Sequence, residues 1–114
     1  MCGIFSIFDR DLKNKKKLLD ISFNLLQHRG PDSKNQMLIN DNLAFGHHRL
    51  SVIDLDDRSS QPMRSLNGRY TIIFNGEIYN FKELKKKIDF NNLKNESDTE
   101  VLLMLWEKYG PSSL

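Results

Sequence analysis

The second residue of the chain is its single cysteine, which stands between Met1 and Gly3. If Met1 is removed, the chain begins with a residue that carries both a thiol and a free α-amino group. An α-amino group titrates near pH 8, at about 7.7–8.0, so this amine is suited to act as the base for the thiol of its own residue. Cys2 is therefore a candidate nucleophile. If Met1 stays, Cys2 is an ordinary small apolar residue near the end of the chain.

A histidine could activate the cysteine instead, and the chain holds His28, His47 and His48. A Cys–His pair would indicate a hydrolase with a different base. The spacing selects none of the three histidines, and each one alone is better explained as a structural hydrogen-bonding residue. His47 and His48 are neighbours on a predicted strand, so their side chains point to opposite faces. Adjacent positions of this kind do not suggest a metal site, and we predict none.

Four further residues have side chains or backbone suited to binding a small polar substrate. Arg49 can hold a carboxylate with two parallel hydrogen bonds. Asn75 offers an amide donor, and Gly76 lets a backbone N–H approach a ligand closely, so together they can form an oxyanion hole. Asp98 at a helix start can bind an ammonium group. The structural alternatives are a surface ion pair, an Asn-Gly turn and a helix cap.

The elements that must position these residues follow from hydrophobic spacing and turn signals. An apolar run predicts a buried strand over 3–8, and Leu18, Leu19, Ser22, Leu25 and Leu26 predict an amphipathic helix over 14–27. Further strands are expected over 36–40, 43–55 and 68–76, with helices beginning at 81 and 98. The two helices follow candidate caps, Asn80 and Ser97, each with a glutamate three residues later. Adjacent strands favour an α+β fold with antiparallel pairing in one domain.

Composition limits the partners. The 114 residues carry a net charge of only +2, so neither nucleic acid nor an anionic membrane is expected as a partner. No apolar run approaches the ~20 residues of a membrane span, and the N-terminus lacks the features of a signal peptide. A single cysteine cannot form an internal disulfide, so we expect a cytoplasmic protein.

Six segments together resemble one family. They are "MCGIF", "HRGPDS", "GHHRLSVIDL", "QPM", "FNGEIYNFKEL" and "SDTEVLL". Their order and spacing are similar to those of class II glutamine amidotransferase domains, which are N-terminal-nucleophile glutaminases. Within that class the segments resemble the glutaminase domain of glutamine-dependent asparagine synthetases, and the resemblance covers nearly all of the chain.

The resemblance implies a role for each matching residue. Cys2, after loss of Met1, would attack the side-chain amide of glutamine, and Asn75 and Gly76 would stabilise the oxyanion. The product would be glutamate and ammonia, with the ammonia used for ATP-dependent amidation, by default of aspartate; the sequence does not name the acceptor. The glutamine-binding residues implied are Arg49, Leu50, Ser51, Val52, Ile53, Asn75, Gly76, Glu77 and Asp98.

The resemblance also implies an αββα sandwich that continues past residue 114, so we expect the fold of this chain to be incomplete at its C-terminus. ATP and Mg would belong to a synthetase domain with an "SGGxD" loop, which these 114 residues do not contain; no cofactor is expected in the chain itself. Expected partners are the remainder of the domain or a second copy. The alternative function is an inactive remnant that binds such a partner.

Overall fold

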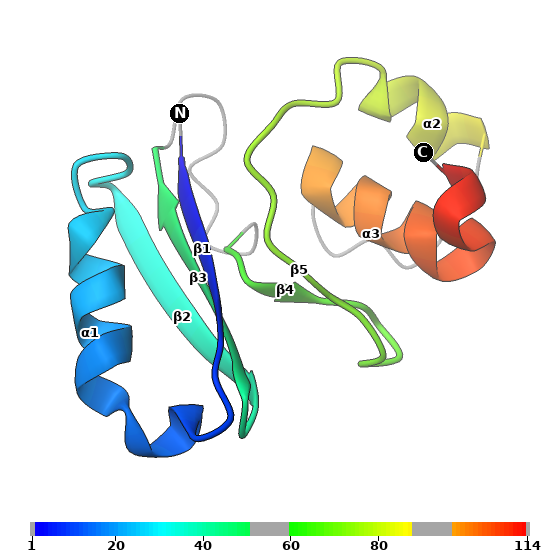
Figure 1. Cartoon of the computed structure of the whole chain (residues 1–114). Helices are drawn as coiled ribbons and strands as arrows, with labels where there is room; N and C mark the ends of the chain where they lie inside the picture. The colour runs from blue at the N-terminus through cyan, green and yellow to red at the C-terminus, as the bar shows by residue number, and fades with distance from the viewer. Residues whose placement is uncertain (1, 51–59, 88–96, 114) are drawn as a thin grey trace.

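The first half of the chain forms a three-stranded antiparallel sheet with one helix against it. In the computed structural model, residues 2–50, 60–87 and 97–113 are described. The strands are β1 (Gly3–Phe8), β2 (Ser33–Asn40) and β3 (Leu43–Arg49), in the order β1-β3-β2 (Figure 1). A short 3₁₀ turn, η1 (Leu12–Asn14), and helix α1 (Lys16–Leu25) connect β1 to β2. The predicted antiparallel α+β arrangement is confirmed.

Helix α1 covers one face of this sheet. The ring of Phe23 on α1 lies 6.3 Å from that of Phe5 on β1 and 4.6 Å from that of His48 on β3. Residues directly opposite in antiparallel strands share a face, and β1 pairs Ile4 with His47 and Gly3 with His48. Ile4 and His47 therefore belong to the face opposite α1, where Figure 1 places β4, β5 and the last helices.

Two packing expectations for this half were wrong. The strand over 3–8 forms, but it is not buried, because Ile4 and Phe8 are exposed on an edge strand. On α1, Leu18 and Leu25 are exposed, whereas Phe23 packs on the sheet. The helical spacing predicted the helix correctly, and the other residues of the predicted face, Leu19, Ser22 and Leu26, are half-buried.

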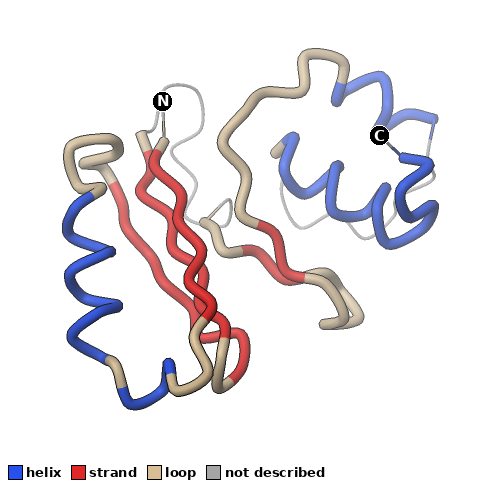
Figure 2. Tube along the Cα trace, viewed as in Figure 1, coloured by secondary structure: helices blue, strands red, loops and turns tan. Residues whose placement is uncertain are grey.

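The second half of the chain pairs a small hairpin with two helices (Figure 2). Strands β4 (Met63–Arg64) and β5 (Thr71–Ile72) pair antiparallel, and helices α2 (Phe81–Lys87) and α3 (Asp98–Tyr109) follow, with a 3₁₀ turn η3 (Gly110–Ser113). The predicted strand over 68–76 is much shorter than expected, and β4 was not predicted. The end of the expected strand over 43–55 lies outside the described residues.

Helix α3 begins as the sequence predicts. The Ser97 hydroxyl accepts a hydrogen bond from the backbone N–H of Glu100 at 3.2 Å, which is N-cap geometry. Val101 and Leu105 are buried, and Phe81 and Leu84 of α2 pack against them. The start of α3 is thus a fixed point for the polar residues described below. Within the described residues, no helix is both long enough and apolar enough to cross a membrane.

Candidate functional site

The Cys2 thiol lies at the edge of the sheet, against the backbone that follows β3. Leu50 donates its backbone N–H to the Cys2 sulfur at 3.5 Å, and the thiol lies 3.9 Å from the Leu50 carbonyl oxygen. These contacts join residues 48 positions apart. The thiol is half-buried, so a small reagent can reach it.

The antiparallel register brings Arg49 to the same end of the sheet. Gly3 pairs with His48, so the next residues outward are Cys2, directly before β1, and Arg49, the last residue of β3. Side chains alternate between faces, which puts both residues on the face opposite α1. Arg49 is half-buried there. A thiol and a guanidinium group thus share one end of one sheet face.

The segment 28–32 lies against the end of β3. Asp32 donates its backbone N–H to the Arg49 carbonyl oxygen at 3.1 Å. A Cβ added to Gly30 would lie only 2.4 Å from the carbonyl carbon and oxygen of His48, so a larger residue does not fit without moving the backbone. The "HRGPD" segment therefore acts here as packing that fixes the strand end which carries Arg49.

None of the three histidines forms a hydrogen bond to Cys2 among the described residues. His28 is exposed. His47 and His48 are buried on opposite faces of β3, and in the described part of the chain His47 Nε2 and both ring nitrogens of His48 have no hydrogen-bond partner. The Cys–His pair that the sequence left open is therefore not formed in this arrangement.

Burial gives His47 a pH-dependent effect on stability. Desolvation first, then the charge of Arg49 and then His48, lowers the pKa of His47 from 6.5 to about 4. Between these two values the unfolded chain binds more protons than the folded chain. The contribution to stability is therefore complete above pH 6.5 and is lost as the pH falls toward 4.

We expect the free energy of unfolding to fall by about 2 kcal/mol between pH 7.5 and pH 5 because of His47. Urea unfolding at both pH values measures this difference. His47→Gln should remove this part of the pH dependence, whereas His28→Gln, which replaces an exposed imidazole, should leave it. An equal fall in the wild type and in His47→Gln would contradict the assignment.

The second group of predicted residues lies between β5 and the start of α3. Asn75, Gly76 and Glu77 are exposed in the segment that joins β5 to α2. The Asp98 carboxylate accepts hydrogen bonds from the backbone N–H of Ile78 at 3.0 Å and of Thr99 at 2.7 Å. The Thr99 hydroxyl also donates to this carboxylate, at 3.4 Å. A carboxylate has about four lone-pair sites, so these three bonds still leave acceptor capacity for an ammonium group.

The predicted site residues thus fall into two groups. Cys2, Arg49 and Leu50 lie together at the end of the first sheet, and Asn75, Gly76, Glu77 and Asp98 lie together beside α3. No hydrogen bond joins the two groups within the described residues. Ser51, Val52 and Ile53 lie outside the described residues.

The sequence did not single out two polar residues that the structure connects to this second group, Gln61 and Thr99. Both are buried, and their side chains form a hydrogen bond to each other. The sequence marked these two residues only indirectly: Gln61 is the first residue of the "QPM" segment of the resemblance, and Thr99 directly follows Asp98.

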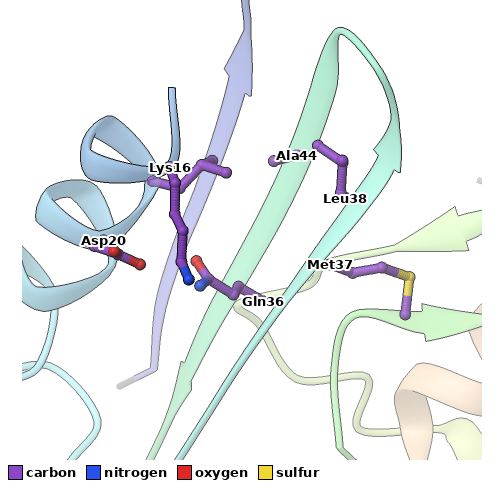
Figure 3. A pocket seen from close by; sticks show the side chains of 7 residues that line it. Lys16, Asp20, Gln36, Met37, Leu38 and Ala44 are labelled. Atoms are coloured by element: carbon purple, nitrogen blue, oxygen red, sulfur yellow. The ribbon is translucent and has the colours of Figure 1, made fainter. Parts of the chain in front are cut away.

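A hollow between α1 and the sheet is separate from this site. Figure 3 shows it between α1 and strands β2 and β3, where the Lys16 and Gln36 side chains point toward each other. It opens on the α1 face, whereas Cys2 and Arg49 belong to the opposite face. The residues that line it are Lys16, Leu19, Asp20, Gln36, Met37, Leu38 and Ala44.

Comparison with known proteins identifies the family to which the chain belongs. A family described as "Glutamine amidotransferase domain" matches the chain over residues 1–114, so the chain belongs to this family. It is 35% identical to asparagine synthetase [glutamine-hydrolyzing] 1 of Bacillus subtilis over 96% of this chain. The identity to asparagine synthetase [glutamine-hydrolyzing] 1 of Arabidopsis thaliana is also 35%, again over 96% of the chain.

A third relative carries a different name. The chain is 31% identical, over 98% of its length, to amidase chry2 of Gibberella zeae. The chain spans 18% of the length of the Bacillus protein and 19% of each of the other two. What these relatives do as whole proteins is therefore attributed to this chain only as a proposal.

Proposed function

We propose that the chain hydrolyses the side-chain amide of glutamine to glutamate and ammonia. The observation that carries this proposal is the pairing of a half-buried thiol with a backbone N–H donor at the end of the sheet face that also holds Arg49. Glutamine is a zwitterion with a side-chain amide. It needs one cation, at least one anion and a nucleophile directed at the amide, and the two groups of residues supply all three.

The reaction would begin with transfer of the Cys2 thiol proton to the α-amino group that loss of Met1 exposes. The sulfur attacks the amide carbon of glutamine, and the oxyanion accepts hydrogen bonds from the Asn75 side chain and the Gly76 backbone N–H. The α-ammonium group then returns the proton to the leaving nitrogen, and ammonia departs. Water, deprotonated by the same amine, attacks the thioester and releases glutamate and the free thiol.

Substrate binding follows from charge. Arg49 would hold the α-carboxylate of glutamine with two parallel hydrogen bonds. Asp98 and Glu77 would receive its α-ammonium group, while Leu50, Ser51, Val52 and Ile53 would line the pocket. A completed αββα sandwich would bring the two groups of residues to one site, and we propose this arrangement for the working domain.

The proposed use of the ammonia rests on the names of the related proteins. Two of them are named as glutamine-hydrolysing asparagine synthetases, which makes ATP-dependent amidation of aspartate the first acceptor to test. The "SGGxD" loop that would bind ATP is not among these 114 residues, so no ATP or Mg step is assigned to them. A cytoplasmic location stays a prediction from the sequence.

The direct test is an assay of the purified chain with glutamine alone. We expect equal amounts of glutamate and ammonia, because each turnover releases one ammonia when the thioester forms and one glutamate when water hydrolyses it. Amide release from asparagine should be much slower, since its side chain is one methylene shorter and does not bring the carbonyl to the sulfur. A chain that binds glutamine without releasing glutamate would contradict the proposal.

The alternative is a chain that acts by binding a partner. It is favoured by β1, a strand at the edge of the described sheet whose Phe8 side chain is 76% exposed. An edge strand with exposed apolar side chains can pair with another strand. Concentration-dependent self-association without glutamate release would support this second function over the first.

A further inference from the structure

We propose that Gln61 is a positioning residue for the Asn75–Gly76 turn, and that it acts together with Thr99. This inference rests on the proposed function, because it assigns the turn to the oxyanion. It is nevertheless carried by contacts that do not depend on any activity. Gln61 has no role in the residue set that the sequence predicts.

Gln61 connects the turn to helix α3. Its side-chain oxygen accepts a hydrogen bond from the backbone N–H of Phe74 at 2.5 Å, and its side-chain nitrogen donates to the Thr99 hydroxyl at 3.2 Å. Gln61 is 6% exposed and Thr99 is 5% exposed. The Gln61–Thr99 hydrogen bond is buried and the Phe74–Gln61 hydrogen bond is part-buried. A partner that is lost at these positions is not readily replaced by water.

The turn is held from its other end as well. Asp98, next to Thr99, accepts the backbone N–H of Ile78 at 3.0 Å. The backbone is therefore held at Phe74 and at Ile78, and the residues between these two are Asn75, Gly76 and Glu77. The first turn of α3 thus fixes the backbone on both sides of the proposed oxyanion donors, directly through Asp98 and indirectly through Thr99 and Gln61.

The position of Phe74 is coupled to that of Gly76, because the side chain of Phe74 packs on the Gly76 backbone. A Cβ added to Gly76 would lie 2.7 Å from the Phe74 ring, so the ring lies directly against the Gly76 backbone. If the Phe74 backbone moves, its ring and the Gly76 N–H must move too. A misplacement of about 1 Å at a reacting centre can cost roughly 10²-fold in rate.

The chemistry of the link explains why an amide stands at position 61. The Phe74 N–H needs an acceptor, and a glutamine side chain supplies one while offering a donor to the Thr99 hydroxyl. Gln61→Met keeps a similar length and loses both hydrogen bonds. Thr99→Val removes the hydroxyl and with it the hydrogen bonds to Gln61 and to the Asp98 carboxylate, whereas Thr99→Ser keeps the hydroxyl.

Ser65 supplies the matched control. It is buried in the hairpin that β4 and β5 form. Its hydroxyl donates a hydrogen bond to Asn67 Oδ1 at 2.9 Å and accepts one from the backbone N–H of Tyr70 at 3.0 Å. Ser65→Ala therefore removes two part-buried hydrogen bonds near β4 and β5 without removing any contact of the Asn75–Gly76 turn. Any general loss of stability in Gln61→Met should be matched by this variant.

The first measurement is amide hydrogen exchange by NMR on the full chain, which needs no activity. We expect exchange at Phe74 to quicken at least about 10-fold in Gln61→Met, the equivalent of one lost hydrogen bond. A change in the Gly76 amide resonance should accompany it. Thr99→Val should give a smaller change in the same direction, and Ser65→Ala none.

The second measurement separates the oxyanion from the nucleophile. Glutamine hydrolysis forms an oxyanion, whereas alkylation of Cys2 by iodoacetamide does not. Gln61→Met should lower kcat for glutamine by about 10- to 100-fold, part of the effect of losing an oxyanion donor. The KM and the alkylation rate should change less than about 3-fold, and Thr99→Ser should recover most of the rate that Thr99→Val loses.

Three results would overturn the proposal. One is unchanged Phe74 exchange in both Gln61→Met and Thr99→Val. Another is a loss of kcat no larger than that of Ser65→Ala, and the third is an alkylation rate that falls in parallel with kcat. If Gln61→Met does not fold, the exchange and kinetic measurements on Thr99→Val and Thr99→Ser test the proposal without it. If the wild type releases no glutamate, the proposed function fails, and the exchange data still decide whether Gln61 holds the turn.

Discussion

Cys2→Ala is expected to lower glutamate release by about 10⁴-fold or more, because loss of a covalent nucleophile removes the reaction path and not merely one contact. Glutamine should still bind, since the variant keeps Arg49 and Asp98. The measurement is the initial rate of glutamate formation at saturating glutamine, together with the affinity for glutamine by calorimetry. Cys2→Ala that retains even a tenth of the wild-type rate would show that this thiol is not the nucleophile.

The same experiment can test the base. A variant with one extra residue before Cys2 keeps the thiol but converts its α-amino group into an amide nitrogen, which cannot accept the proton. We expect this variant to lose the hydrolysis rate while its thiol is still alkylated. Mass spectrometry of the active wild type must show loss of Met1. Full activity with Met1 retained would exclude the α-amino group as the base.

Asn75→Ala is expected to lower kcat by about 10²- to 10³-fold, the usual effect of removing one side-chain donor from an oxyanion hole. The KM for glutamine should change much less, because the negative charge on the oxygen develops only in the transition state. Steady-state kinetics over a range of glutamine concentrations separate the two constants. The N–H of Gly76 remains in this variant, so a residual rate above that of Cys2→Ala is expected.

Asn24→Ala is the matched control for Asn75→Ala. Asn24 is exposed on α1, on the other side of the sheet from Cys2 and Arg49. Its replacement removes the same amide group and should leave both kinetic constants near those of the wild type. A rise in KM with an unchanged kcat in Asn75→Ala would assign this residue to ground-state binding, and the oxyanion role would then fall to other groups.

The local elements were largely predictable because their signals lie within a few residues. The Ser97 cap is formed as its spacing with Glu100 predicts, and helix α3 begins at Asp98 as expected. Strands β2 and β3 pair antiparallel across a short turn. The family also followed from the sequence, because six motifs in order are specific in a way that no single cysteine or arginine is.

Burial was less predictable. The run over 3–8 has the composition of a buried strand, yet β1 lies at the edge of the described sheet and exposes Phe8. Composition reports how a strand can pack, whereas the position of the strand in the sheet decides how much of it is covered. For the same reason Leu18 and Leu25 are exposed on a helix that was correctly predicted.

The sequence by itself determined which chemical groups this protein has: a thiol at residue 2, a cation at Arg49, amide donors at Asn75 and Gly76 and a carboxylate at Asp98. Only the tertiary structure decided which of them meet. The Cys2 thiol reaches Leu50 because Gly3 pairs with His48, and a register shifted by one residue would turn one strand's side chains to the other face. Likewise Gln61 reaches Phe74 and Thr99 only after distant segments have packed together, a contact that no local spacing encodes.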